Sequence, residues 1–139
     1  MSDEEFLAAF ESCSLPRDAW THRAHVRMAW LYLARLPLAE ARCVVSAGIR
    51  RYNDMRIGKP LAYHETITQA FLTLIAARRD SAESFEAFCA RADDLLDSKL
   101  SALLVHYQRE TLFSITAREA FLPPDLAPFP GISAPTCRQ

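Results

Sequence analysis

Apolar residues recur at helical spacing along almost the whole chain, and no segment alternates apolar and polar residues for long as a strand would. Four stretches carry this helical pattern over many residues and are bounded by residues that begin or end helices. We expect long helices over residues 22–36, 38–56, 63–79 and 84–108, with short helices over residues 3–12 and 114–121.

The boundaries of these stretches decide how the helices connect. Thr21 is a suitable N-cap for the first long helix, and Pro37 ends it. The stretch 84–108 contains no Gly or Pro and its apolar residues keep one phase, so one helix is favoured over two helices broken near Asp97. Short connections favour antiparallel neighbours, so the predicted fold is all-α, an up-down bundle of about four long helices.

The length and the last residues indicate one domain with a distinct tail. A chain of 139 residues is a common size for a single domain, which we place at 1–139. Residues 122–139 are rich in proline and are predicted to be extended. Leu126 and Phe129 are too apolar for a solvated linker, so we expect both to be buried against the body or a second subunit.

Charge and cysteine content exclude several classes of protein. The formal net charge is -1 and the basic residues are scattered, so neither nucleic acid nor a membrane is expected as a partner. The N-terminus is acidic, unlike a signal peptide, and no apolar run approaches the roughly 18 residues of a membrane span. No CxxC pair is present. We therefore expect a cytoplasmic protein.

Histidines occupy positions at helix ends that a core helix usually gives to leucine or alanine. His22 and His25 lie at the N-terminal end of the inward face of the helix 22–36, and His64 has the same place in the helix 63–79. In an up-down bundle these two ends meet, and the C-terminal end of the helix 84–108, with His106, meets them. The pattern therefore predicts that all four histidines gather at one end of the bundle.

Clustered imidazoles suit a divalent metal, for which we consider Zn, Ni or Fe. His22, His25 and His64 are the predicted ligands, because three histidines leave an open position for water, as catalytic zinc sites do. His106 is a fourth ligand or a proton shuttle, and Glu65 is a candidate general base. If the protein is an enzyme, metal-assisted hydrolysis is the reaction class that this set favours.

Aromatic and basic side chains near the histidines are candidates for contacts with a substrate, each with a simpler structural reading. Trp20 packs at the start of a helix or forms a pocket wall, and Arg51 favours a helix C-terminus or reaches an anion. The predicted substrate-binding residues are Trp20, Arg51, Tyr52, Tyr63 and Tyr107. Two alternatives stay open, a metal-free domain that binds a small molecule and a structural or interaction protein. A homodimer also stays open.

Three stretches carry a resemblance to a known family. They are WTHRAHVRMAWLYL near the start, RYN followed by YHETIT in the middle, and YQRETLFSITAREAF with PPDLAPFP near the end. Together they resemble a small bacterial all-helical family that is itself uncharacterised. The resemblance spans nearly the whole chain and implies a stand-alone helical domain, but it implies no reaction.

Overall fold

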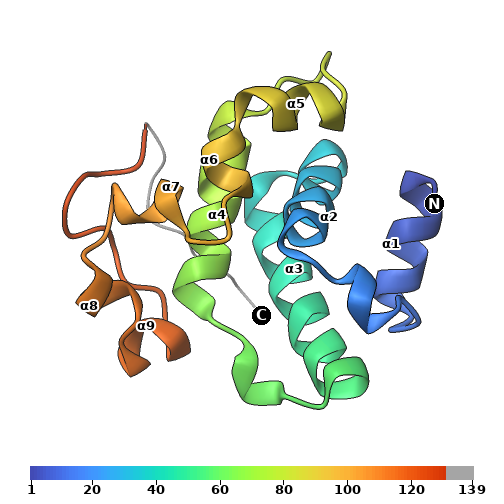
Figure 1. The fold of residues 1–139 in the computed structure, drawn as a ribbon, viewed down its shortest axis with the longest axis horizontal. Coiled ribbons are helices and arrows are strands. Elements are labelled where there is room, and N and C mark those ends of the chain that lie inside the picture. The colour runs from blue at the N-terminus through green and yellow to red at the C-terminus, as the bar shows by residue number, and fades with distance from the viewer. Residues whose placement is uncertain (131–139) are drawn as a thin grey trace.

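Three long helices form the body of the protein. The computed structural model describes residues 1–130, and within that range every regular element is helical, which confirms the all-α prediction. The long helices are α2 (His22–Arg35), α3 (Leu38–Tyr52) and α4 (Glu65–Arg78), and each packs against the other two (Figure 1). Their inward faces form one hydrophobic core, as the spacing of apolar residues predicts.

The N-terminal helix α1 (Asp3–Glu11) packs against α3. Ser2 begins α1 with a reciprocal capping box, in which its hydroxyl accepts from the backbone N–H of Glu5. Phe10 is fully buried, and a Cβ added at Gly48 of α3 would lie 2.8 Å from its ring. The helices approach closely at this point because Gly48 has no side chain.

The helices α2 and α3 begin and end close to the predicted residues. The Thr21 hydroxyl accepts from the backbone N–H of Ala24 at the start of α2. After Tyr52, α3 widens into a π-helical turn, η2 (Asn53–Ile57), which ends at Gly58 in the left-handed conformation at φ 74°. Short 3-10 turns, η1 (Arg17–Ala19) and η3 (Pro60–Ala62), precede α2 and α4. Turns of π-helix are often found at functional sites.

The prediction of one helix over residues 84–108 is wrong. The stretch forms α5 (Phe85–Arg91), α6 (Asp93–Leu96) and α7 (Ser101–Leu104). The Asp97 carboxylate accepts from the backbone N–H of Lys99 at 2.9 Å and from the Ser101 hydroxyl, which offers the chain an alternative to helical hydrogen bonds. Leu100 then takes a left-handed conformation at φ 63°, which ends any continuous helix.

The shared phase of the apolar residues in this stretch arises from a common buried surface. Phe88, Leu95 and Leu103 come from three different helices, and each is fully buried. Because all three pieces lie on one side of the body, periodicity alone does not reveal the breaks between them. The up-down arrangement of four long helices is consequently not confirmed, and the body has three.

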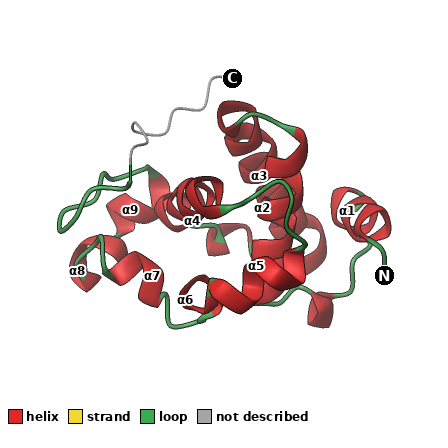
Figure 2. Ribbon diagram, turned by 90° about the horizontal axis from the view of Figure 1, so that it is seen from above, coloured by secondary structure: helices red, strands yellow, loops and turns green. Residues whose placement is uncertain are grey.

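The C-terminal segment consists of two short helices and an extended strap, residues 122–130. The helices are α8 (Arg109–Leu112) and α9 (Ile115–Glu119), and α9 packs against α4 (Figure 2). Phe129 is partly buried with its ring centroid 4.9 Å from that of His106, whereas Leu126 is 56% exposed. Phe129 therefore packs partly against the body, Leu126 is not covered by this chain although its backbone N–H is bonded, and burial against a second subunit stays a prediction. The remainder of the predicted tail, 131–139, lies outside the described residues.

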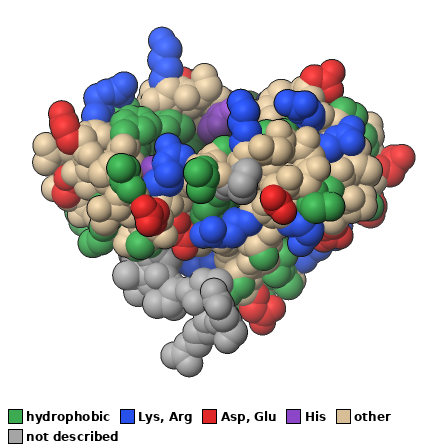
Figure 3. All heavy atoms as spheres, turned by 90° about the horizontal axis from the view of Figure 1, so that it is seen from below, with side chains coloured by type: hydrophobic (Ala, Val, Ile, Leu, Met, Phe, Trp, Pro, Cys, Tyr) green, Lys and Arg blue, Asp and Glu red, His purple; other side chains and the backbone are tan. Residues whose placement is uncertain are grey.

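The surface carries both signs of charge. Figure 3 shows Lys and Arg side chains interspersed with Asp and Glu over the face seen from below, together with histidine side chains that reach the surface. Within residues 1–130, no helix has the length and apolar character that crossing a bilayer requires.

Candidate functional site

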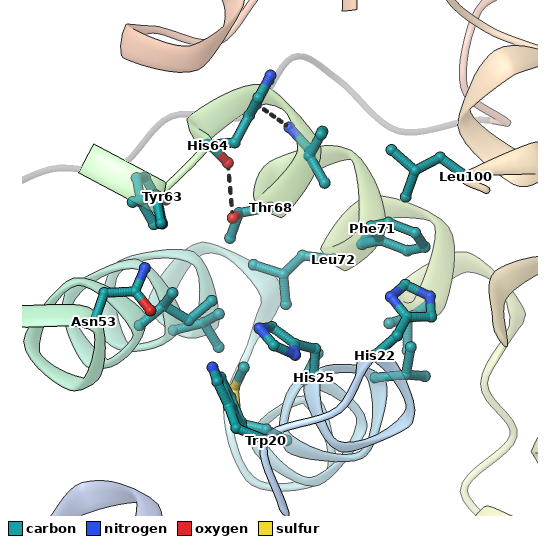
Figure 4. A pocket seen from close by; sticks show the side chains of 18 of the residues that line it. Trp20, His22, His25, Asn53, Tyr63, His64, Thr68, Phe71, Leu72 and Leu100 are labelled. Atoms are coloured by element: carbon teal, nitrogen blue, oxygen red, sulfur yellow. Dashed lines mark hydrogen bonds between the residues drawn. The ribbon is translucent and has the colours of Figure 1, made fainter. Parts of the chain in front are cut away.

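A cavity of about 500 Å³ lies between α2, α3 and α4 (Figure 4). Most of its wall is apolar, with side chains that include Val26, Val45, Ile49, Ile67, Leu72 and Ile75. The polar and aromatic side chains of the wall are Trp20, His22, His25, Asn53, Tyr63, His64 and Thr68. No Asp, Glu, Lys or Arg of the described residues lines the cavity. Its volume lies within the range of small-molecule sites.

His22 stands at one side of the cavity, with its ring centroid 5.3 Å from that of Phe71. Its Nε2 lies 2.8 Å from the carbonyl oxygen of Leu95 near the end of α6. A carbonyl only accepts, so Nε2 carries the proton and Nδ1 of the neutral ring keeps a lone pair. His22 thereby satisfies a carbonyl that the end of α6 leaves unpaired.

His25 lies near the centre of the cavity wall, between Trp20 and Leu72 (Figure 4). Its Nδ1 donates to the carbonyl oxygen of Thr21 at 2.7 Å, and its ring centroid is 3.9 Å from that of Trp20. Within residues 1–130, Nε2 has no hydrogen-bond partner. Burial lowers the pKa of His25 to about 4. At neutral pH the ring is therefore uncharged and Nε2 is an acceptor.

His64 is the N-cap of α4, and both of its ring nitrogens are occupied. Nδ1 accepts from the backbone N–H of Ile67 at 3.1 Å, and Nε2 donates to the carbonyl oxygen of Leu112 at 2.8 Å. Burial lowers its pKa, which keeps the ring neutral. His64 lines the same cavity as His22 and His25, but it has no nitrogen left for the predicted metal.

The described side chains do not come together as the predicted set of metal ligands. Among residues 1–130, no three His, Cys, Asp or Glu side chains lie close enough together to hold an ion. His106, the predicted fourth ligand, does not line the cavity. Its Nδ1 donates instead to the carbonyl oxygen of Ala127 at 2.8 Å and fastens the strap. Three of the four histidines therefore line one cavity, and His106 lies elsewhere.

Tyr63 and Glu65 form a pair at the start of α4. The Tyr63 hydroxyl donates to the Glu65 carboxylate and is 2.9 Å from the Ser46 hydroxyl. Burial is the main cause that raises the pKa of Tyr63, and the hydrogen bond to Glu65 raises it further. The guanidinium carbon of Arg50 lies 4.1 Å from the Tyr63 ring centroid. Tyr63 lines the cavity, whereas Glu65, the predicted general base, does not.

The other predicted substrate-binding residues lie away from the cavity wall. Tyr52 is fully buried and donates to the carbonyl oxygen of Leu15 at 2.7 Å. Tyr107 is buried and donates to the carbonyl oxygen of Leu122 at 2.7 Å. Arg51 is exposed. Both tyrosines therefore anchor backbone segments, and only Trp20 and Tyr63 of the predicted set reach the cavity.

Asn53 and Leu100 line the cavity, and sequence reasoning missed both. Asn53 is buried as the first residue of the π-helical turn, and its side chain points into the cavity (Figure 4). Its carboxamide makes no hydrogen bond to residues 1–130. A polar residue at a helix end is usually a solvated C-cap, which is why Asn53 was not predicted to line a site. The RYN run, residues 51–53, is the one sequence feature that could have indicated it.

The indole of Trp20 contributes a second unpaired polar group beside the cavity. Its Nε1 is buried and has no partner among the described residues. An unsatisfied buried donor costs about 1–3 kcal/mol. The nitrogen faces the space between Asn53 and His25 (Figure 4) but has no exposed area, so a ligand reaches it only after a neighbouring side chain rotates.

These observations define an all-helical protein with a mostly apolar cavity that no described Asp, Glu, Lys or Arg lines and that carries a few hydrogen-bonding groups. No protein-family model, curated protein or solved structure matches the chain.

Proposed function

We propose that the protein binds a small organic molecule in the cavity between α2, α3 and α4. The observation that carries this proposal is the cavity itself, about 500 Å³ of space with an apolar wall inside a chain of 139 residues. The cavity is only partly enclosed, so its apolar wall faces water and lacks packing contacts that a closed interior would have. A ligand that fills the cavity would restore those contacts.

The polar groups of the wall support binding over a purely structural role. Asn53 is buried without a hydrogen bond to the described residues, and Nε2 of His25 is also unpartnered. Binding sites typically combine an apolar wall with a few polar groups that orient the ligand. The proposal contains no metal, because both ring nitrogens of His64 are already bonded within the protein.

Fluorescence titration with N-phenylnaphthylamine, an uncharged dye that brightens in apolar surroundings, tests this proposal. Ala62 lines the cavity and is exposed, so Ala62→Trp should obstruct the opening without disturbing the core. Ala87 is exposed on α5 and lies outside the wall, so Ala87→Trp is the matched control. We expect the wild type and Ala87→Trp to bind the dye alike and Ala62→Trp to bind several-fold more weakly.

Two results would contradict the proposal. The first is a wild-type protein that does not bind the dye, and the second is equal binding by Ala62→Trp and Ala87→Trp. Native mass spectrometry of the purified wild-type protein adds an independent measurement. A stoichiometric organic mass that is retained by Ala87→Trp and lost from Ala62→Trp would identify the natural ligand.

A further inference from the structure

The polar groups of the cavity restrict the chemistry of the molecule that occupies it, and this inference rests on the proposed function. We infer that the ligand is uncharged and presents a hydrogen-bond donor, an O–H or N–H group, to Nε2 of His25. The remainder of the ligand is apolar, to match the aliphatic wall.

The charge of the ligand follows from what the wall lacks. No Asp, Glu, Lys or Arg of the described residues lines the cavity. A carboxylate, phosphate or ammonium group would lose its hydration there and meet no carboxylate, ammonium or guanidinium group of opposite charge, which is strongly unfavourable. His25 and His64 supply no compensating positive charge at neutral pH, because burial lowers the pKa of both.

The requirement for a donor follows from the tautomer of His25. The carbonyl oxygen of Thr21 holds a proton on Nδ1, so Nε2 presents a lone pair. His22 also donates to a backbone carbonyl, but through the other ring nitrogen. The carbonyl oxygen of Leu95 holds the proton on Nε2, so Nδ1 carries the lone pair in the neutral ring. Two backbone carbonyls therefore set two imidazole rings as acceptors in one cavity wall.

His25 is the better placed of the two acceptors. It lies near the centre of the cavity wall, whereas His22 stands at one side, and the bond to Thr21 and the contact with Trp20 fix the direction of Nε2 (Figure 4). The carboxamide of Asn53 faces the cavity from α3, and it can pair with either a donor or an acceptor elsewhere on the ligand (Figure 4). Fixed acceptors select among ligands, because a ligand without the donor leaves them unpaired.

Matched naphthalene derivatives test the inference without knowledge of the natural ligand. Naphthol has a hydroxyl donor, methoxynaphthalene has the same oxygen without a donor, and naphthalene has neither. Calorimetric titration of the wild type should give naphthol a three- to tenfold advantage over methoxynaphthalene, as expected for about one hydrogen bond. Naphthoate should bind most weakly, because it is an anion.

The variant His25→Phe assigns the effect to one atom. Phenylalanine keeps a ring against Trp20 but has no nitrogen, so naphthol and methoxynaphthalene should bind it equally, with naphthalene affinity unchanged. Equal wild-type affinities for naphthol and methoxynaphthalene would overturn the inference and leave the proposed function standing. A naphthol advantage that persists in His25→Phe would overturn the assignment to His25. Failure of all the uncharged compounds to bind would overturn the proposed function itself.

Discussion

Each of the four histidines donates a ring N–H to a backbone carbonyl. The acceptors are Thr21 for His25, Leu95 for His22, Leu112 for His64 and Ala127 for His106. Leu95 and Leu112 lie at the ends of short helices that leave carbonyl oxygens unpaired, and Ala127 lies in the extended segment that follows α9. The imidazole rings donate hydrogen bonds to these carbonyl oxygens across long sequence separations, and an aliphatic side chain cannot make such bonds.

The low pKa of His25 predicts a pH dependence of stability. The pKa is about 4 in the folded protein and about 6.5 in an unfolded chain. Between these values the unfolded chain binds a proton that the folded chain does not, so the free energy of unfolding falls as the pH falls. Between pH 7 and pH 5, protonation of His25 in the unfolded chain should lower the free energy of unfolding by about 2 kcal/mol.

Urea denaturation of the wild type and His25→Phe at both pH values measures this effect. Between pH 7 and pH 5, the free energy of unfolding of the variant should fall by about 2 kcal/mol less than that of the wild type. His64 shifts stability in the same direction, but it is present in both proteins and so cancels in the comparison. Equal losses in the two proteins would contradict the prediction.

The two bonds of His64 can be separated by substitution. His64→Asn keeps a side chain that caps helices well but loses the bond to Leu112, whereas His64→Ala loses both bonds. We expect both variants to be less stable than the wild type, with the alanine variant lower than the asparagine variant by about 1 kcal/mol. Equal stabilities in urea denaturation would show that the N-cap bond contributes nothing.

At the scale of elements, the turn between α6 and α7 shapes the cavity. Asp97 organises this turn through Lys99 and Ser101, and Leu100 follows in the left-handed conformation and lines the cavity. A leucine in that conformation carries a cost of roughly 1–2 kcal/mol. The surrounding contacts must hold it there, and Leu100 does pack against the core.

Removal of the Asp97 carboxylate should therefore affect stability and binding together. Asp97→Ala leaves the Lys99 N–H without its partner and should cost about 1 kcal/mol in urea denaturation. Dye affinity should fall as well, because Leu100 loses its support. Asp97→Asn retains an acceptor oxygen and should lose less of both. An alanine variant with wild-type stability and wild-type dye affinity would contradict this role.

The long helices could be predicted from the sequence, and the breaks after α5 could not. Thr21, Pro37 and Gly58 mark their boundaries by local chemistry, which a sequence displays directly. The break near Asp97 is held by local hydrogen bonds that a helical phase does not reveal, and the bond between Leu95 and the distant His22 has no local signal at all. The sequence indicated that His22, His25 and His64 lie together, but not that His22 and His64 pair with the carbonyl oxygens of Leu95 and Leu112, because those residues lie in segments whose fold the pattern did not predict.

At the scale of the whole molecule, the C-terminal strap connects α4 with the segment around α8. The Thr66 hydroxyl donates to the carbonyl oxygen of Ala120 and accepts from the backbone N–H of Leu122. Further along, Asp125 accepts from the backbone N–H of Gln108 at 3.0 Å. Phe129 adds the apolar contact that the sequence suggested. The strap is thus held by several bonds to backbone groups, with little help from burial.

Two truncated chains measure the contribution of the strap. A chain that ends at Pro130 keeps the described strap, and a chain that ends at Phe121 lacks it. We expect the shorter chain to melt several degrees lower, because each lost hydrogen bond contributes about 1 kcal/mol. The chain that ends at Pro130 is the control for the loss of residues 131–139. Equal melting temperatures would show that the strap is a solvated appendage.

The position of Trp20 makes the molecule its own optical reporter. The chain has two tryptophans, and only Trp20 lines the cavity, whereas Trp30 lies against Phe85 and Arg79. In the variant Trp30→Phe, all indole emission would come from the cavity wall. Protonation of the adjacent His25 would quench that emission, and an apolar occupant would shift it to shorter wavelength. Ligand occupancy could thus be followed from the emission wavelength and intensity of Trp20, without any added label.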